Sequence, residues 1–145
     1  ATIKSASNQD IPPLTEQLFA LYIQNPMLIY GNKSLRNEIE AIDNSLALST
    51  AITNLVNAYN TINTSHIVEH YRTHALASTI AHLASVDIMI PHDGIESECR
   101  DIIVRIQRQN TQNKLDELLH KSRDNVLSEA ERKRIQNLLL MLKKQ

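Results

Sequence analysis

The stretch from His66 to His74 reads HIVEHYRTH, and its histidines and glutamate have the types and spacing of metal ligands. Its first five residues fit H-x-x-E-H, a pattern used by one class of zinc proteases. Residues four apart share a helix face, so the imidazoles of His66 and His70 could bind one ion, and His74 could extend that face. A site of this kind, with Glu69 between the histidines, would make the chain a small helical metal-dependent hydrolase.

Other features of the stretch favour an ordinary structural helix. A catalytic metal site needs a further ligand from elsewhere and a shaped cleft, and no acidic helix downstream stands out for that role. Tyr71-Arg72-Thr73 is typical of a helix end, which would carry His74 away from the other two histidines. We therefore expect no catalytic residue, no metal site and no cofactor here. The hydrolase and an adventitious metal site are kept as alternatives.

Other nucleophiles and phosphate sites find no support in the sequence. No serine stands in a glycine-framed elbow, and the two glycines of the chain cannot build a phosphate loop. Cys99, the only cysteine, lies on an apolar stripe and is expected in the core. A single cysteine cannot form an internal disulfide, which fits a reducing compartment and predicts a cytoplasmic protein.

The composition predicts an all-α fold. The 145 residues fit one domain or one domain with a small appendage, and 42% of them are hydrophobic, enough for a core. A β-rich chain needs frequent turn residues, which two glycines and four prolines do not supply. No signal peptide or membrane-length apolar run occurs, so no membrane contact is expected.

Apolar periodicity and breakers place the elements. Pro12-Pro13 starts a helix that Asn25-Pro26 ends, because the residue before proline avoids the α region. MLIY is a short turn or helix closed by Gly31. Further helices are expected at 34–42, 48–59, 66–72 and 75–84. The helix at 48–59 has one apolar stripe, formed by Leu48, Ala51, Ile52, Leu55 and Tyr59, which is expected to face inward. A polar connector precedes the helix at 66–72 and could cap its start.

The segment after the turn at 91–94 predicts the domain organisation. Cys99, Ile102, Ile103 and Ile106 form a stripe, QRQNTQNK (107–114) has no apolar residue, and Leu115, Leu118 and Leu119 resume the stripe. Without Gly or Pro the helix need not stop, and a helix that is polar all round commonly bridges two packed units. We expect a linker at 1–10, disordered or a cloning remnant, a helical bundle at 11–107, and a connecting helix with a C-terminal hairpin at 108–145.

The hairpin is expected to turn at residues 124–127, with Ser128 as N-cap and Glu131 completing a capping box. The last helix directs Ile135, Leu138, Leu139 and Leu142 inward, while Leu140 and Met141 lie well off that stripe. Two helices cannot bury apolar groups on every side, so either the terminus folds back or these two residues contact another molecule. Residues 114–145 carry eight Lys/Arg and five Asp/Glu, a net of +3, against −4 for residues 1–113.

Three stretches resemble the C-terminal, helicase-interacting domain of bacterial DNA primase (DnaG). They are LYIQNPMLI (21–29), IVEHYR (67–72) and LDELLHKSRDNVLSEAERKRIQNLLLMLKK (115–144), in that family's order. The resemblance implies a multi-helix bundle followed by a helical hairpin that docks on the N-terminal domains of the replicative helicase DnaB. It also implies that primer synthesis belongs to other domains, so this segment would bind protein and would not be an enzyme.

Residue types and the resemblance together predict the contact surface. It comprises Arg132, Arg134, Leu138, Leu140, Met141, Lys143 and Lys144. An apolar helix flanked by charges can lie in a partner's groove, whereas the lack of interleaved aromatic residues disfavours strong nucleic-acid binding. The exposed leucines also allow a weak homodimer through the hairpin.

Two departures from the family pattern affect these expectations. Asn125-Val126 stands where the family often has glycine before Leu-Ser, and Asn can take the left-handed conformation that such a turn needs. Some members hold the acidic tail of single-stranded DNA-binding protein at basic residues beginning the first helix. Here that region reads DIPPLTEQ, with Asp10 and Glu16, so this partner is left open. The similar N-terminal domain of the helicase itself is a third alternative, against which the charged leucine-rich tail argues.

Overall fold

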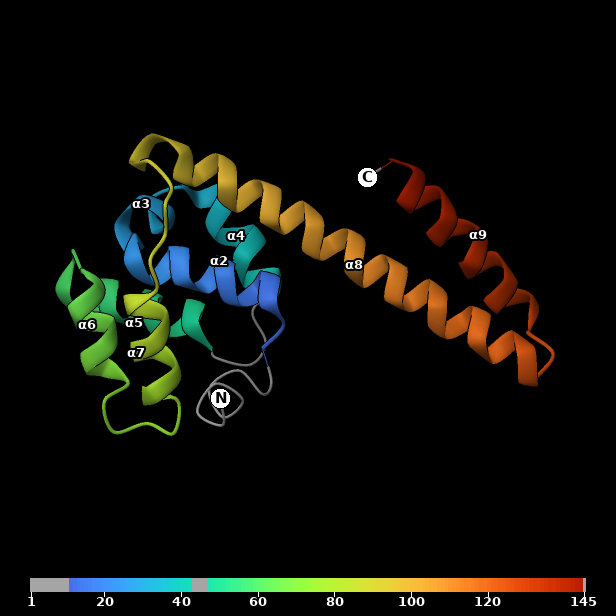
Figure 1. Cartoon of the computed structure of the whole chain (residues 1–145), viewed down its shortest axis with the longest axis horizontal. Helices are drawn as coiled ribbons and strands as arrows, with labels where there is room; N and C mark the ends of the chain where they lie inside the picture. The colour runs from blue at the N-terminus through green and yellow to red at the C-terminus, as the bar shows by residue number, and fades with distance from the viewer. Residues whose placement is uncertain (1–10, 43–46, 145) are drawn as a thin grey trace. The chain divides into compact units, whose positions relative to one another are not determined.

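The computed structural model describes residues 11–42 and 47–144, and this part of the chain forms eight α-helices and one 3-10 helix, with no strand. The all-α prediction is therefore confirmed (Figure 1). The helices are α2 (Pro13–Gln24), α3 (Pro26–Tyr30), α4 (Lys33–Ile42), α5 (Leu48–Tyr59), α6 (Thr64–His70), α7 (Ala77–Ser85), η1 (His92–Gly94), α8 (Ile95–Asp124) and α9 (Glu129–Lys144). The expected linker at 1–10 lies outside the described residues.

The described residues divide into two compact units, one ending at Ile103 and one beginning at Val104. We call them the bundle and the hairpin. Helix α8 passes through this division as one helix of 30 residues, so the expected continuity through 107–114 is confirmed. The proposed subdomain boundary near Gln107 stays a prediction. None of the described helices combines the length and apolar character needed to cross a membrane.

The expectation that residues 107–114 face solvent on all sides is wrong at Thr111. This side chain is buried, with 5% of its surface exposed. It lies one turn before Leu115 on the same helix face, and its hydroxyl donates a hydrogen bond to the carbonyl of Gln107 at 2.9 Å. Because the hydroxyl is paired within its own helix, a threonine can occupy an inward position there at little cost.

Helix α2 supplies a large share of the bundle core. Pro12 precedes it and Pro13 occupies its first turn, as the sequence predicts. Its side chains Leu18, Phe19 and Ile23 are fully buried, and the helix packs against α3, α6 and α7. Burial on more than one side requires an apolar helix, and α2 has one charged residue, Glu16, among its twelve.

The Gln24-Asn25-Pro26 break between α2 and α3 joins several elements. The amide of Gln24 donates to the carbonyls of Leu83 and Val86, at 2.9 and 2.8 Å, which ties the end of α2 to the end of α7. Pro26 has no N–H for the carbonyl of Tyr22, and the backbone N–H of Asn25 donates to that carbonyl at 3.2 Å instead. The side-chain amide of Asn25 donates to the carbonyl of Leu21 at 3.0 Å.

The first turns of α8 complete the bundle core. Cys99, Ile102 and Ile103 are buried there, as expected from their spacing, and Ile95 is buried as well. Burial raises the pKa of the Cys99 thiol to about 12, with the neighbouring Glu98 carboxylate adding to the effect, so the thiol stays protonated in the core. Arg100 binds Glu38 of α4 at 3.3 Å and Glu96 of its own helix at 3.2 Å.

Candidate protein-binding surface

The HIVEH stretch does not form a catalytic site in this structure. Asn63 caps α6, its side-chain oxygen accepts the N–H of His66 at 3.2 Å, and His66 Nδ1 accepts the N–H of Asn63 at 3.0 Å. A histidine therefore completes a capping box that usually uses Glu or Gln. The Glu69 carboxylate pairs with Arg72 at 3.0 Å. In residues 11–42 and 47–144 no group of three His, Cys, Asp or Glu is placed to hold a metal ion.

The rest of the stretch is structural, which leaves the hydrolase alternative without support. Ile67 is fully buried, and Tyr71 is buried with its ring edge-on to His70 and His74 at 5.2 and 5.3 Å between centroids. Tyr59, expected to point inward from the previous helix, is 60% exposed. It lies at the last residue of α5, where its ring meets that of His66 at 5.4 Å instead of entering the core.

The turn of the hairpin is held by hydrogen bonds and one ion pair. The N–H of Glu131 donates to the Ser128 hydroxyl at 3.1 Å, and the N–H of Ser128 donates to the Glu131 carboxylate at 3.0 Å. The predicted capping box is therefore confirmed. Lys121, at the end of α8, donates to the same carboxylate. Lys121 and the Ser128 amide lower the pKa of Glu131 below its ordinary value.

The turn needs no left-handed residue. Among the described non-glycine residues, positive φ occurs at Ala47 and Asn60. The suggested left-handed conformation at Asn125 is therefore wrong: its N–H instead donates to the carbonyl of Lys121 at 3.0 Å and extends the last turn of α8. The chain then crosses to α9 through Val126 and Leu127.

The interior of the hairpin is a narrow stripe. Thr111 and Leu115 on α8 and Leu138 on α9 are buried, while Ile135 and Leu142 are half-buried. Two residues expected inside are instead exposed, Leu119 by 42% and Leu139 by 51%. Each helix has only one neighbour in this unit, so the buried arc is narrower than the one that the i, i+3, i+4, i+7 rule assumes for a helix in a full bundle.

The end of α9 carries exposed apolar side chains on more than one side. Leu139, Leu140 and Met141 are exposed by 51%, 57% and 47%. With about 100° per residue, Leu140 points away from the buried Leu138, and the other two point to either side of it. Five consecutive apolar residues, LLLML at 138–142, cannot all lie on one face, and this run was the signal that could have placed Leu139 outside.

The seven residues predicted as a contact surface differ in their exposure to solvent. Leu138 was predicted as a contact residue, but it is buried in the hairpin. It therefore packs beneath the surface and is not exposed to a partner. The other six residues are exposed: Arg132, Arg134, Leu140, Met141, Lys143 and Lys144. Lys143 and Lys144 lie three and four residues after Leu140 and therefore flank it on the same side of the helix.

Two arginines attach the hairpin's own segments to one another. The Arg132 guanidinium donates to the carbonyl of Leu127 at 3.3 Å, beside the turn. The Arg108 guanidinium donates to the carbonyl of Leu142 at 3.2 Å, which accepts within the last turn of α9. A cation there also suits the negative end of the helix dipole.

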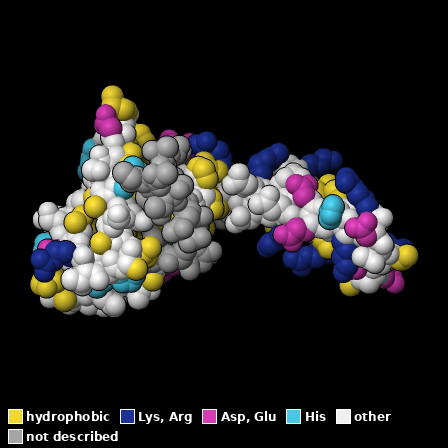
Figure 2. All heavy atoms as spheres, turned by 60° about the horizontal axis from the view of Figure 1, so that its bottom comes forward, with side chains coloured by type: hydrophobic (Ala, Val, Ile, Leu, Met, Phe, Trp, Pro, Cys, Tyr) yellow, Lys and Arg dark blue, Asp and Glu magenta, His cyan; other side chains and the backbone are white. Residues whose placement is uncertain are grey.

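The two units carry opposite charge. The described residues of the bundle contain four Lys/Arg and nine Asp/Glu, a net of −5, and those of the hairpin contain ten and five, a net of +5. Figure 2 shows dark blue Lys and Arg side chains spread over the hairpin among apolar ones. Helix α2 has no basic residue, and its first turn carries Glu16, whereas Asp10 lies outside the described residues.

Comparison with known proteins agrees with this architecture. A family model described as "DNA primase DnaG DnaB-binding" matches residues 15–138, most of the chain. The chain belongs to this family. Its function as a helicase-interaction module follows from that membership, and the helicase DnaB is the partner that the family description names.

Two relatives extend the comparison. A DNA primase of Legionella pneumophila is 34% identical over 77 residues, which are 53% of this chain and 13% of that primase. The second is the solved structure of the DnaG primase C-terminal domain from Vibrio cholerae. The superposition includes 88% of this chain and 96% of the Vibrio chain, with a TM-score of 0.55 and 24% sequence identity, and it therefore shows the shared fold. The family match ends at Leu138, so the exposed end of α9 lies beyond it.

Proposed function

We propose that the chain binds DnaB through the hairpin and thereby couples primer synthesis to unwinding by the helicase. Leu140 is the observation that supports this assignment. It points away from the only buried residue of α9, remains 57% exposed, and has Lys143 and Lys144 on either side. A large apolar side chain in such a position has no role in the fold of the hairpin, and its removal from water requires another molecule.

The contact has the form of a helix laid against a groove. Leu140 and Met141 are the apolar anchors, and Arg132, Arg134, Lys143 and Lys144 are the flanking charges. A few apolar anchors supply most of the affinity of such contacts, and the surrounding charges select the partner and raise the association rate. The N-terminal domains of the helicase are the proposed docking site, on a surface that presents an apolar groove edged with carboxylates.

The chain is proposed to act without catalysis of its own. It spans about an eighth of the length of the Legionella primase that it matches, and primer synthesis is assigned to the rest of such a protein. The buried, protonated Cys99 and the capping role of His66 leave these groups no catalytic use. We place the parent protein at the bacterial replication fork in the cytoplasm.

The substitution Leu140→Glu tests the surface directly. Because Leu140 is exposed, the fold should tolerate the change, whereas a carboxylate at the centre of the contact opposes burial. We expect affinity for the cognate DnaB to fall at least about tenfold, measured by fluorescence anisotropy, with helicity and melting nearly unchanged. Val126→Glu is the matched control, because Val126 is 89% exposed at the turn of the same unit.

A shortened chain tests whether the hairpin is needed at all. A chain that ends at Gln112 keeps every element of the bundle and loses α9. We expect it to lose helicase binding in a pull-down. Undiminished binding by this chain would assign the contact to the bundle instead, and undiminished binding by Leu140→Glu would exclude Leu140 from the contact.

A further inference from the structure

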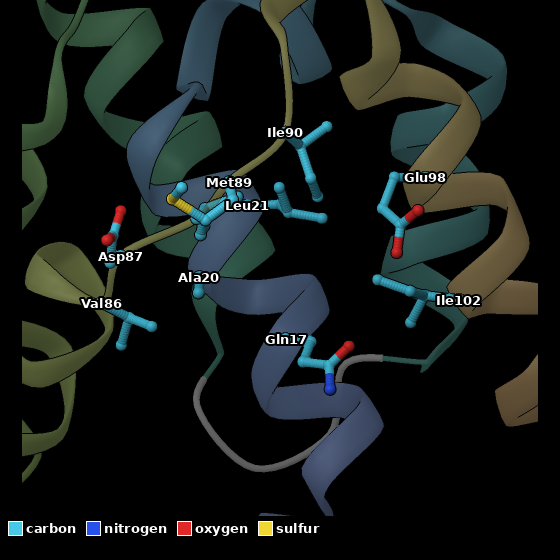
Figure 3. Close-up of a pocket in the computed structure, with 10 residues that line it drawn as sticks. Gln17, Ala20, Leu21, Val86, Asp87, Met89, Ile90, Glu98 and Ile102 are labelled. Atoms are coloured by element: carbon cyan, nitrogen blue, oxygen red, sulfur yellow. The ribbon is translucent and has the colours of Figure 1, made fainter.

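A groove in the bundle, formed by residues other than those of the hairpin surface, has the properties of a second binding site. It lies between α2, the segment from Val86 to Ile90 that follows α7, and the first turns of α8 (Figure 3). Its cavity of about 320 Å³ lies at the lower end of the range typical of ligand sites. The buried side chains of Leu21 and Ile102 form an apolar floor, and their own exposure is 2% and 1%.

The groove continues along α2. A second hollow of about 270 Å³ lies between α2 and the end of α7, and shares Gln17, Ala20 and Val86 with the first. Ala20 has the smallest side chain of the shared wall, which leaves α2 open to approach on this side. Together the two hollows follow α2 from Glu16 to Leu21, somewhat more than one turn of helix, and this elongated form suits a short peptide better than a compact small molecule.

Three carboxylates line the groove, and His82 of α7 is the one basic side chain among its described lining residues. Asp87 and Glu98 line the first hollow, on opposite sides in the view of Figure 3, and Glu16 lines the second. No Lys or Arg is among the described residues that line either hollow. Arg100, on the same helix as Glu98, is engaged with Glu38 and Glu96. The carboxylates therefore remain available to a cation from outside, within a bundle whose net charge is already −5.

One apolar side chain at the groove is unusually exposed. Met89 is 84% exposed on the segment between α7 and η1, the largest exposure of any methionine or leucine in the described residues. A thioether side chain adapts its shape to different apolar partners and is common on peptide-binding surfaces. Met89, Leu21 and Ile90 line the same hollow, so a bound apolar residue could pack between Met89 and the floor (Figure 3).

We propose that this groove binds a short segment of another protein in which apolar residues are interspersed with Lys or Arg. The apolar residues occupy the floor beneath Met89, and the cations pair with Asp87, Glu98 and Glu16. Acidic peptides and phosphate-bearing ligands are disfavoured, because three carboxylates repel them and no Lys or Arg among the described lining residues offsets that charge. The site would let the module hold a basic partner on the bundle while the hairpin is bound to an acidic one.

Two synthetic peptides test the charge preference with the complete chain. One contains leucines interspersed with lysines, and the other has the same leucines with glutamates in place of lysines. We expect the cationic peptide to bind about tenfold more tightly in fluorescence anisotropy, and to lose most of that advantage when salt is raised to about 1 M. Equal or tighter binding of the acidic peptide overturns the proposal.

Substitutions locate the site. Glu98→Gln and Asp87→Asn should each weaken the cationic peptide about three- to fivefold, since an exposed ion pair contributes about that factor. Met89→Ser should weaken peptide binding at low salt, and it should also weaken the binding that remains at high salt. Glu40→Gln, an exposed carboxylate on α4 outside the groove, should leave affinity unchanged. An equal effect of Glu40→Gln assigns the binding to general charge and overturns the site.

Two further outcomes separate this site from its alternatives. Leu140→Glu should leave peptide binding intact, so failure of the helicase contact and failure of the groove are distinguishable. Helix α9 itself carries basic and apolar residues, so a second copy of the chain could act as the ligand. Sedimentation equilibrium tests this, and a dimer that Glu98→Gln abolishes would replace the proposed foreign partner with self-association.

Discussion

The bundle and the hairpin are stabilised in different ways, although α8 contributes to both. In the bundle, α2 buries Leu18, Phe19, Tyr22 and Ile23 completely. In α9, which is longer than α2, Leu138 is the one buried residue. The bundle is therefore held by a core, whereas the hairpin depends on a capping box, an ion pair and a narrow apolar stripe. The apolar groups that the hairpin leaves exposed are the ones available to a partner.

The same contrast appears in charge. A bundle of net −5 and a hairpin of net +5 select different partners, because like charges brought together at an interface are costly. The proposed hairpin contact is suited to an acidic surface and the proposed bundle groove to a basic segment. Under these two proposals, one chain would bring two partners together at separate sites.

A core substitution in the bundle gives the largest expected effect. Leu18→Ala removes a fully buried side chain and leaves a cavity, so the free energy of unfolding should fall by ~3 kcal/mol. Denaturation followed by circular dichroism measures it. Leu28→Ala on α3, where the side chain is 38% exposed, is the matched control and should cost less than about 1 kcal/mol. Similar losses from both changes would show that the bundle does not depend on its core.

A cap substitution in the hairpin should have a smaller and local effect. Ser128→Ala removes the hydroxyl that accepts the N–H of Glu131, and loss of an N-cap costs ~1 kcal/mol. Hydrogen–deuterium exchange should accelerate in α9 and stay unchanged in α2, because regions with few buried contacts open locally. Ser34→Ala, an exposed serine on α4, serves as control. Faster exchange in α2 as well would mean that the two units unfold together.

Much of this contrast could be predicted from the sequence. Breakers and caps act locally, so Pro12-Pro13, Asn25-Pro26 and the pair Ser128 and Glu131 defined element ends that the structure confirms. The stripe at Cys99, Ile102 and Ile103 was also placed correctly, because that side of α8 is almost fully removed from solvent within the bundle.

The errors at Leu119 and Leu139 share one physical cause. Periodicity shows which residues lie on one helix face, but the width of the buried arc depends on how many neighbours cover it. Leu119 and Leu139 were placed inside by the rule that fits a helix in a bundle, and in a unit of two helices both are exposed. Thr111 was taken as solvated because it is polar, although its hydroxyl is paired within α8. His66 was considered as a ligand, while its distance to the Asn63 N–H makes it a cap.

The smallest expected effect is a pH dependence confined to the hairpin. The pKa of Glu131 is lowered in the folded chain, chiefly by Lys121 and then by the Ser128 amide. A carboxyl group with a lowered pKa adds stability above its ordinary unfolded pKa, and this stability is lost as the pH falls toward the folded value. Exchange at the start of α9 should therefore accelerate, relative to the intrinsic rate, as the pH falls through and below the ordinary glutamate range.

Glu131→Gln separates this contribution from general acid unfolding. Glutamine keeps an oxygen to accept the N–H of Ser128 but cannot form the ion pair with Lys121, so the variant should show faster exchange at neutral pH and a flatter pH profile. Exposed ion pairs contribute little, so the difference should be modest and should shrink further at high salt. If the variant and the native chain share one pH profile, the turn is held by the capping box alone, and Lys121 contributes nothing measurable to the hairpin that presents Leu140.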